Sequence, residues 1–190
     1  MSEAALIERI AARGDGVTGD GRHVTGGVPG DRVRDDGIII PGPNRTEPAC
    51  RHFGKCGGCQ LQHVAEPALA DFVRDRVVGG LGGQGVPYGD VRPARLSPPQ
   101  SRRRAALTAL RTGKQVAIGF NAAQSNQIVD MRMCPLLLPE LFALIDPVRD
   151  LLVTVAQPRR PVKVKLQMLD QGVELILEGV KAEGLDAAMA

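Results

Sequence analysis

Three of the four cysteines in this chain fall within ten residues, in the segment Cys50-Arg-His-Phe-Gly-Lys-Cys56-Gly-Gly-Cys59. The fourth, Cys134, follows 75 positions after Cys59. Cysteine thiolates bind soft metals, and glycine lets a backbone fold tightly around a bulky centre and turn its N–H groups toward sulfur. The pattern therefore predicts one metal centre held by Cys50, Cys56, Cys59 and Cys134.

Other uses of these cysteines fit their surroundings less well. Two disulfides would need an oxidising compartment, and the first ten residues lack the basic and apolar regions of a secretion signal. A redox-active Cys56-Gly-Gly-Cys59 pair would normally follow a strand and open a helix, whereas the preceding stretch is rich in Pro, Gly and Asn. Both alternatives therefore fit the sequence less well than a metal centre.

Zinc is the main competitor as the bound metal. Zinc sites usually pair two short cysteine knuckles, and Cys134 has no second cysteine near it. His52 and His63 could complete a zinc site with the clustered cysteines, which would leave Cys134 as an ordinary buried thiol. An iron–sulfur cluster fits three clustered ligands and one distant ligand better.

The cysteine pattern also carries a family resemblance. Cys50-x5-Cys56-Gly-Gly-Cys59-x2-Gln62-His63, followed by Cys134-Pro135-Leu136-Leu137, resembles the iron–sulfur signature of the bacterial RNA (uracil-5-)-methyltransferase family. Residues 11–17 and 28–33 resemble the start of its small TRAM barrel, and residues 102–105, 118–120 and 125–130 resemble its middle domain. The resemblance thus covers most of the chain.

The resemblance implies a cofactor and a reaction. It implies a [4Fe–4S] cluster on the four cysteines, with Gln62 and His63 supporting the ligands. It also implies methyl transfer from S-adenosylmethionine to carbon 5 of a uridine in ribosomal or transfer RNA. The family's methyltransferase domain would follow the middle domain. We expect no catalytic residue and no S-adenosylmethionine site within these 190 residues, and no activity from them alone.

Composition limits the class of protein. The chain is 43% apolar and 24% charged, which is ordinary for a soluble globular protein. No apolar run approaches the roughly 18 residues needed to cross a bilayer. We therefore expect a cytoplasmic monomer without a membrane partner.

The elements around the cysteines form two different patterns. Short alternating segments separated by glycine turns in residues 1–47 predict a small OB-like, TRAM-like β-barrel. Residues 48–66 are expected to form the iron–sulfur loop, after a proline-rich linker. Residues 67–190 predict an α+β middle domain with mainly antiparallel strands, which supplies Cys134. We expect a helix from Pro67 to the glycine pairs at 79–83, followed by a hairpin over 103–111 and 115–120. A second helix is expected over 139–155, kinked or split by Pro147. Paired strands are expected over 162–168 and 173–178.

Charge is distributed unevenly, although the net charge is only +3. No acidic residue lies between Asp90 and Asp130, a stretch with six arginines and one lysine. Guanidinium groups suit bidentate contacts to phosphate, so this stretch predicts binding to structured RNA, either rRNA or tRNA. The alternative is a solvated face that only keeps the protein soluble. The predicted RNA-binding residues are Arg102, Arg103, Arg104, Arg111 and Lys114, with a second acid-free cluster at Arg159, Arg160, Lys163 and Lys165.

Two functions remain open at this stage. The first is the RNA-recognition and cluster-bearing part of an RNA uridine methyltransferase. The second is a free-standing metal-binding and RNA-binding module without catalysis. An electron carrier is disfavoured, because the basic surface is typical of an RNA-binding protein and no flavin or second cluster motif is present.

Overall fold

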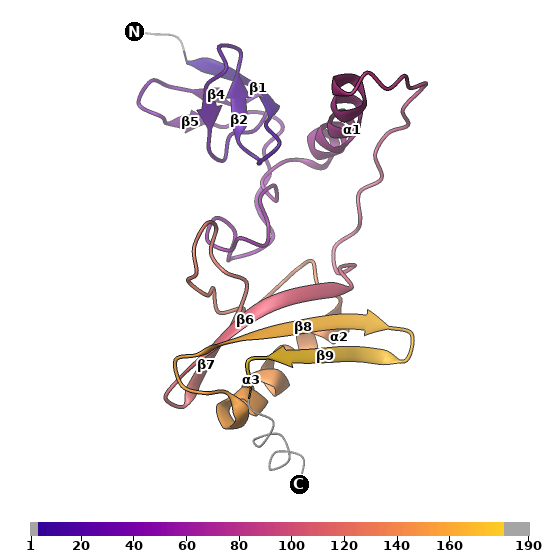
Figure 1. Ribbon diagram of the computed structural model, residues 1–190. Helices are drawn as coiled ribbons and strands as arrows, with labels where there is room; N and C mark the ends of the chain where they lie inside the picture. Colours follow the sequence, from indigo (N-terminus) through magenta and orange to yellow (C-terminus); the bar gives the residue numbers. More distant parts are fainter. Residues whose placement is uncertain (1–3, 181–190) are drawn as a thin grey trace. The chain divides into compact units, whose positions relative to one another are not determined.

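The computed structural model describes residues 4–180 and divides them into two compact units (Figure 1). Unit 1 comprises the described residues up to Ala49 together with Gln60–Leu96. Unit 2 comprises Cys50–Cys59 and the described residues from Ser97 onward. The units therefore group residues differently from the predicted division at 48–66, and the last ten residues of the predicted middle domain lie outside the described residues.

Unit 1 contains a curled five-stranded antiparallel sheet (Figure 1). Its strands are β1 (Ala5–Ile10), β2 (Gly16–Thr18), β3 (His23–Val24), β4 (Arg32–Val33) and β5 (Ile39–Ile40), in the order β3-β2-β1-β4-β5. The sheet confirms the small β structure expected from the turn spacing. Strand β2 occupies a segment that begins at an expected glycine turn. A Cβ at position 16 would lie only 2.8 Å from Ile7 Cγ2. Because Gly16 has no Cβ, β2 can lie close enough to β1 to pair with it.

Helix α1 (Glu66–Gly83) follows the sheet in unit 1. It begins with Pro67 in its first turn, where the missing N–H costs no hydrogen bond. It runs through the first glycine pair and ends at the second. Leu69 and Phe72 pack against a small core that includes Ile10, Val28 and Val64. No helix within residues 4–180 is long and apolar enough to span a membrane.

Unit 2 contains a four-stranded antiparallel sheet in the order β7-β6-β8-β9 (Figure 1). The strands are β6 (Arg104–Thr112), β7 (Gln115–Gly119), β8 (Pro161–Leu169) and β9 (Gly172–Glu178). Alternate residues of β6 and β8 are buried on one face, as their sequence patterns predict. Both predicted hairpins and the predicted α+β class are confirmed.

Two helices cover the buried face of this sheet: α2 (Pro139–Ala143) and α3 (Ile145–Val155). Leu141, Ile145, Val148 and Leu152 are buried against it. The predicted helix over 139–155 is split, as Pro147 suggested, but the break lies at Leu144. A proline clashes with the carbonyl four residues before it and cannot donate to that carbonyl, so the helix restarts just ahead of Pro147.

Candidate functional site

The ten residues that carry three cysteines form a tight loop in unit 2. The N–H of Phe53 donates to the Cys50 carbonyl, and the N–H of Cys56 donates to the His52 carbonyl, each at 2.9 Å. Gly54 adopts a φ of 82° between these turns, a conformation that favours glycine. These hydrogen bonds within the loop therefore fix the path of the backbone between Cys50 and Cys56.

The Cys56–Cys59 end of the loop packs on the chain just after β7. Cys56 forms an isolated antiparallel bridge with Ala122, and the N–H of Gly57 donates to the Asn121 carbonyl at 2.9 Å. A Cβ on Gly57 would lie 2.8 Å from that carbonyl oxygen. The N–H of Gly58 points at Cys56 Sγ at 3.4 Å. The two glycines therefore allow close packing on one side and an N–H donor to sulfur on the other.

The Cys134 segment is linked to the same loop through His52. The N–H of Arg132 donates to His52 Nε2 at 3.2 Å, so this ring nitrogen carries no proton. Cys134 itself packs, partly exposed, against the core of unit 2. All four predicted ligands thus belong to one compact unit.

The four cysteines are free thiols, each partly exposed. Among residues 4–180, no three His, Cys, Asp or Glu side chains are arranged so that they could hold one metal ion. In chemical type, the thiols, the N–H donor to sulfur and the paired glycines fit an iron–sulfur centre.

Asp130 stabilises the chain just ahead of Cys134. Its carboxylate accepts hydrogen bonds from the Ile118 N–H at 3.1 Å and from Arg149 Nη1 at 2.6 Å, and it pairs with Arg132. Burial alone would raise the pKa of Asp130, but the bonds from Arg149 and Ile118 outweigh it and lower the pKa below its ordinary value. The carboxylate is therefore charged at neutral pH and anchors residues 130–132 to β7 and α3.

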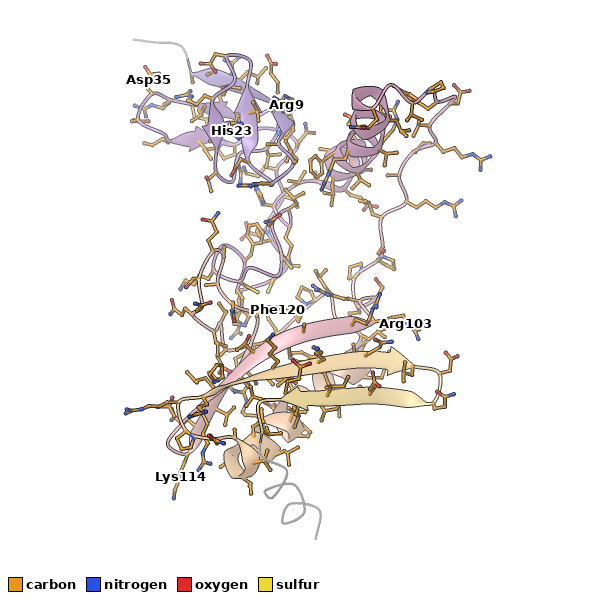
Figure 2. All side chains as sticks on the ribbon, viewed as in Figure 1. Arg9, His23, Asp35, Arg103, Lys114 and Phe120 are labelled. Atoms are coloured by element: carbon orange, nitrogen blue, oxygen red, sulfur yellow. The ribbon has the colours of Figure 1, made fainter. Side chains whose placement is uncertain are left out.

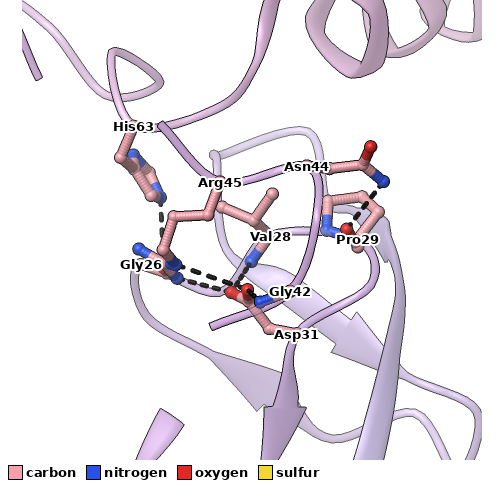
Figure 3. Close-up of polar contacts among 8 residues, drawn as sticks. All are labelled: Gly26, Val28, Pro29, Asp31, Gly42, Asn44, Arg45 and His63. Carbon is pink, nitrogen blue, oxygen red and sulfur yellow. Dashed lines mark hydrogen bonds and ion pairs between the residues drawn. The ribbon is translucent and has the colours of Figure 1, made fainter. Parts of the chain in front are cut away.

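His63, predicted to support the cysteine ligands, is buried in unit 1 (Figure 3). Its Nε2 lies 3.1 Å from the Gly26 carbonyl, which can only accept, so Nε2 carries the proton. Burial, followed by the nearby Arg45 charge, lowers the pKa of His63. Gln62 belongs to the same unit, and its buried side-chain amide has no hydrogen-bond partner among the described residues.

A buried ion pair lies beside His63 (Figure 3). The Asp31 carboxylate accepts bonds from the N–H groups of Val28 at 2.8 Å and Gly42 at 2.7 Å, and it pairs with Arg45. Arg45 Nη2 also donates to the Gly26 carbonyl at 2.7 Å. The sequence placed Asp31 only within residues 28–33, the segment that resembles the TRAM barrel, and did not indicate this ion pair. The Asp31–Arg45 ion pair therefore has a structural role. Its carboxylate is already bonded to Val28, Gly42 and Arg45, so we assign it no ligand.

The predicted RNA-binding cations lie toward the two ends of β6. Arg102–Arg104 precede or begin the strand, whereas Arg111 and Lys114 lie at its far end, about 30 Å away for nine extended residues. Figure 2 shows Arg103 and Lys114 at opposite ends of the sheet. Arg103 donates to the Met168 carbonyl and Arg111 to the Ala156 carbonyl. Within residues 4–180, none of these five cations pairs with a carboxylate, so their charge is not neutralised locally.

Two residues near the cysteines were not predicted to have the contacts observed. His52 was considered as a possible zinc ligand, and its bond to Arg132 spans 80 positions. Phe120 was expected only as part of the hairpin and of the family resemblance, yet its ring lies under the Arg102 guanidinium, 5.1 Å from Arg102 Cζ. The only sequence signal for His52 was its place two residues after Cys50.

Comparisons with known proteins agree with the resemblance. No family model matches the chain. The chain is 40% identical, over 97% of its length, to a protein of Zymomonas mobilis subsp. mobilis named as an uncharacterized RNA methyltransferase, and the match covers 46% of that protein. A second protein named as an uncharacterized RNA methyltransferase, from Brucella suis biovar 1, is 37% identical over 91% of the chain. This match covers 44% of that protein. The chain is a homologue of RNA methyltransferases.

A third relative of this RNA methyltransferase homologue has a more specific name. The 23S rRNA (uracil(1939)-C(5))-methyltransferase RlmD of Halomonas elongata is 31% identical over 95% of the chain, and the match covers 42% of that protein. The chain therefore spans a little less than half the length of these relatives. The predicted family resemblance is confirmed.

Proposed function

We propose that this chain is the RNA-recognition and cluster-bearing part of an S-adenosylmethionine-dependent methyltransferase that modifies carbon 5 of a uridine in rRNA or tRNA. The proposal is carried by one observation: the Cys50–Cys59 loop belongs to the same compact unit as Cys134 and is bonded to the chain at Asn121 and Arg132. The names of the relatives support RNA as the substrate.

The proposed cofactor is a [4Fe–4S] cluster on Cys50, Cys56, Cys59 and Cys134. Each thiolate of such a cluster binds a different iron, so the centre does not need three ligands around one ion. When bound, the cluster would supply a cross-link between the loop and the Cys134 segment, or a redox-sensitive group. The Gly58 N–H would stabilise the Cys56 thiolate, and His52 would hold the loop at Arg132.

The proposed RNA contacts are electrostatic. Arg102–Arg104 and Lys114 are exposed, and none of them has a carboxylate partner among the described residues. Such cations attract phosphates and displace counterions from RNA. Their placement at both ends of β6 suits a structured RNA that spans the sheet, because contacts about 30 Å apart require an extended ligand.

The chain alone is proposed to transfer no methyl group. In the family chemistry, a cysteine thiolate adds to carbon 6 of uracil, which makes carbon 5 nucleophilic. All four cysteines are assigned to the cluster, so none is left for this addition. The catalytic thiolate and the S-adenosylmethionine site would belong to the remaining part of the enzyme.

The cofactor assignment is tested by anaerobic reconstitution with iron and sulfide. We expect a brown protein with broad absorbance near 400 nm and about four irons per chain. Cys134→Ser should lose the cluster, whereas Ser101→Ala, which removes a hydroxyl bonded to the Pro98 carbonyl, should retain it. Stoichiometric zinc without iron would overturn the assignment.

The RNA and activity assignments are tested on the same preparation. Titration with structured rRNA and tRNA at several salt concentrations should give affinity that falls as salt rises. Incubation with labelled S-adenosylmethionine should give no methylated RNA. Methyl transfer by these 190 residues would contradict the division of roles, and no RNA affinity at low salt would contradict the recognition role.

A further inference from the structure

The backbone around Arg102 is joined to the segment that carries Cys134. Arg102 forms an isolated parallel bridge with Leu137. The N–H of Arg102 donates to the Leu136 carbonyl at 2.8 Å, and the N–H of Leu138 donates to the Arg102 carbonyl at 3.1 Å. The N–H of Gln100 donates to the Pro135 carbonyl at 2.9 Å. Residues 100–102 thus form backbone hydrogen bonds with residues 135–138, which directly follow Cys134.

The side chain of Arg102 is joined to the other cysteine segment through an aromatic ring. Its guanidinium lies over Phe120, with Cζ 5.1 Å from the ring centroid. The ring in turn lies against the Cys56–Cys59 loop, since a Cβ on Gly58 would be 3.0 Å from Phe120 Cδ2. Phe120 is partly buried against the core of unit 2, and its carbonyl accepts the Val129 N–H at 2.9 Å. The ring therefore lies close to the Arg102 guanidinium, to Gly58 and to the core of unit 2.

We propose that Phe120 is a positioning residue, which fixes the guanidinium of Arg102 for an RNA phosphate and makes that position depend on the Cys56–Cys59 loop. The inference rests on the proposed function, because it assigns RNA as the ligand of Arg102 and a cluster as the group that orders the loop. It adds a link between the two sites that neither the cysteine pattern nor the charge pattern contains.

The orientation of Arg102 explains how it would work. Nε donates to the Arg104 carbonyl at 3.1 Å, and the ring limits rotation of the guanidinium plane. The bond from Nε leaves the two Nη groups as a planar fork, the geometry that suits bidentate phosphate binding. An arginine that is already oriented loses less side-chain freedom when it binds. If the loop at Gly58 loosens, the ring and the fork lose this support.

A second arginine–phenylalanine pair provides a matched control. On α1, Arg76 Cζ lies 5.8 Å from the Phe72 ring centroid. That pair belongs to unit 1, whereas the Arg102–Phe120 pair and the cysteines belong to unit 2. Phe120→Leu and Phe72→Leu therefore remove the same kind of contact, and only the first contact is linked to the loop.

The experiment measures RNA dissociation constants and iron content for the wild type, Phe120→Leu, Arg102→Ala, the double variant and Phe72→Leu. We expect Phe120→Leu to weaken RNA binding by about two- to fivefold, the range of an exposed cation–π contact. Arg102→Ala should weaken binding less in the Phe120→Leu background than in the wild type. Removing iron should reproduce the loss in the wild type and change Phe120→Leu less. Phe72→Leu should bind as the wild type.

Two further variants keep the test decisive if Phe120→Leu also lowers iron content. Phe120→Tyr retains the ring and should restore both affinity and iron. Arg102→Lys keeps the charge but loses the planar fork, so it should bind RNA more weakly with iron unchanged. Wild-type affinity for Arg102→Lys, or additive effects of Phe120→Leu and Arg102→Ala, would overturn the inference. Absence of RNA binding by the wild type would instead overturn the proposed function.

Discussion

His52 Nε2 accepts a hydrogen bond of 3.2 Å from the backbone N–H of Arg132, although the two residues lie 80 positions apart. This bond joins the loop that carries three cysteines to the segment that carries the fourth. It also fixes the imidazole ring two residues after Cys50. The bond therefore gives His52 a structural role that does not require it to bind a metal.

Replacement of His52 tests that role. His52→Ala removes one hydrogen bond, worth about 1 kcal/mol, so the reconstituted cluster should be lost about fivefold faster in air. The measurement is the decay of absorbance near 400 nm. His23→Ala is the control, because His23 is an exposed residue of unit 1 that lies 3.9 Å from Asp15. Complete failure of His52→Ala to take up iron would instead identify His52 as a ligand.

Gly57 offers a test of close packing at the loop. In Gly57→Ala the new Cβ would lie 2.8 Å from the Asn121 carbonyl oxygen, a backbone atom, so the loop has to shift. We expect lower iron content and more rapid cleavage of residues 50–59 by protease. In Gly80→Ala, the new Cβ meets no atom within 4 Å and replaces a helical glycine, which should stabilise α1 by about 0.5–1 kcal/mol. Equal iron content in both variants would argue against the packing role.

The buried Asp31 predicts how stability depends on pH. Burial alone would raise the pKa of Asp31, but the bonds from Arg45, Gly42 and Val28 outweigh it, so its pKa in the folded protein lies below the ordinary value of 3.8. A lowered pKa means that the carboxylate stabilises the fold fully above the unfolded pKa. This stabilisation is lost as pH falls through the folded pKa. Urea unfolding should therefore show a loss of stability at acidic pH that is smaller in Asp31→Asn.

Removal of one member of the buried pair should be costly at neutral pH. Arg45→Ala leaves the Asp31 carboxylate buried, and Asp31 is fully inaccessible to solvent, so we expect a loss of about 3–5 kcal/mol in unit 1. Asp36→Asn is the control, since Asp36 is exposed and pairs with Arg34 in the same unit. A change below about 1 kcal/mol for Arg45→Ala, the range of an exposed pair, would contradict this account.

The cations at the start of β6 predict the salt dependence of RNA binding. Replacing Arg102, Arg103 and Arg104 by Ala should weaken binding and flatten the slope of log affinity against log salt by up to about three units. Arg34→Ala and Arg74→Ala are controls, because these arginines pair with Asp36 and Asp75. RNA titrations at several salt concentrations give the slopes. Equal slopes for the triple variant and the controls would mean that these arginines do not bind phosphate.

The sequence predicted the sheet of unit 2 well, because alternating apolar residues define its buried face. The sequence also predicted the break near Pro147. Proline disturbs the helix through its own ring and missing N–H, so its effect can be predicted without knowing the tertiary structure. Strand β2 was not predicted, because three residues beginning at a glycine carry too little pattern. The grouping of Cys50–Cys59 with unit 2 was also not predicted. It depends on backbone bonds to Asn121 and Ala122, and no side-chain pattern encodes such bonds.

Cysteine type and spacing indicated four candidate metal ligands, whose role in holding a cluster remains a prediction. The contacts that link the neighbouring residues to one another could not be read from the sequence. The placement of His63 beside Gly26, 37 positions away, and of Phe120 under Arg102 depends on tertiary packing. Arginine content led to the prediction of an RNA-binding surface. It did not show that the predicted cations would lie in two groups, one at each end of β6.

The interrupted path of unit 1 has a consequence for synthesis on the ribosome. The core of unit 1 contains Ile10 and Val28 from before the cysteine loop and Val64 from after it, with Phe72 packed against them. The nascent chain therefore cannot complete this unit until all three clustered cysteines have been made. Cys134 follows 75 positions after Cys59, a delay of roughly 4–15 s at about 5–20 residues per second. During that interval three of the proposed ligands are present without the fourth, so iron delivered early would meet an incomplete set.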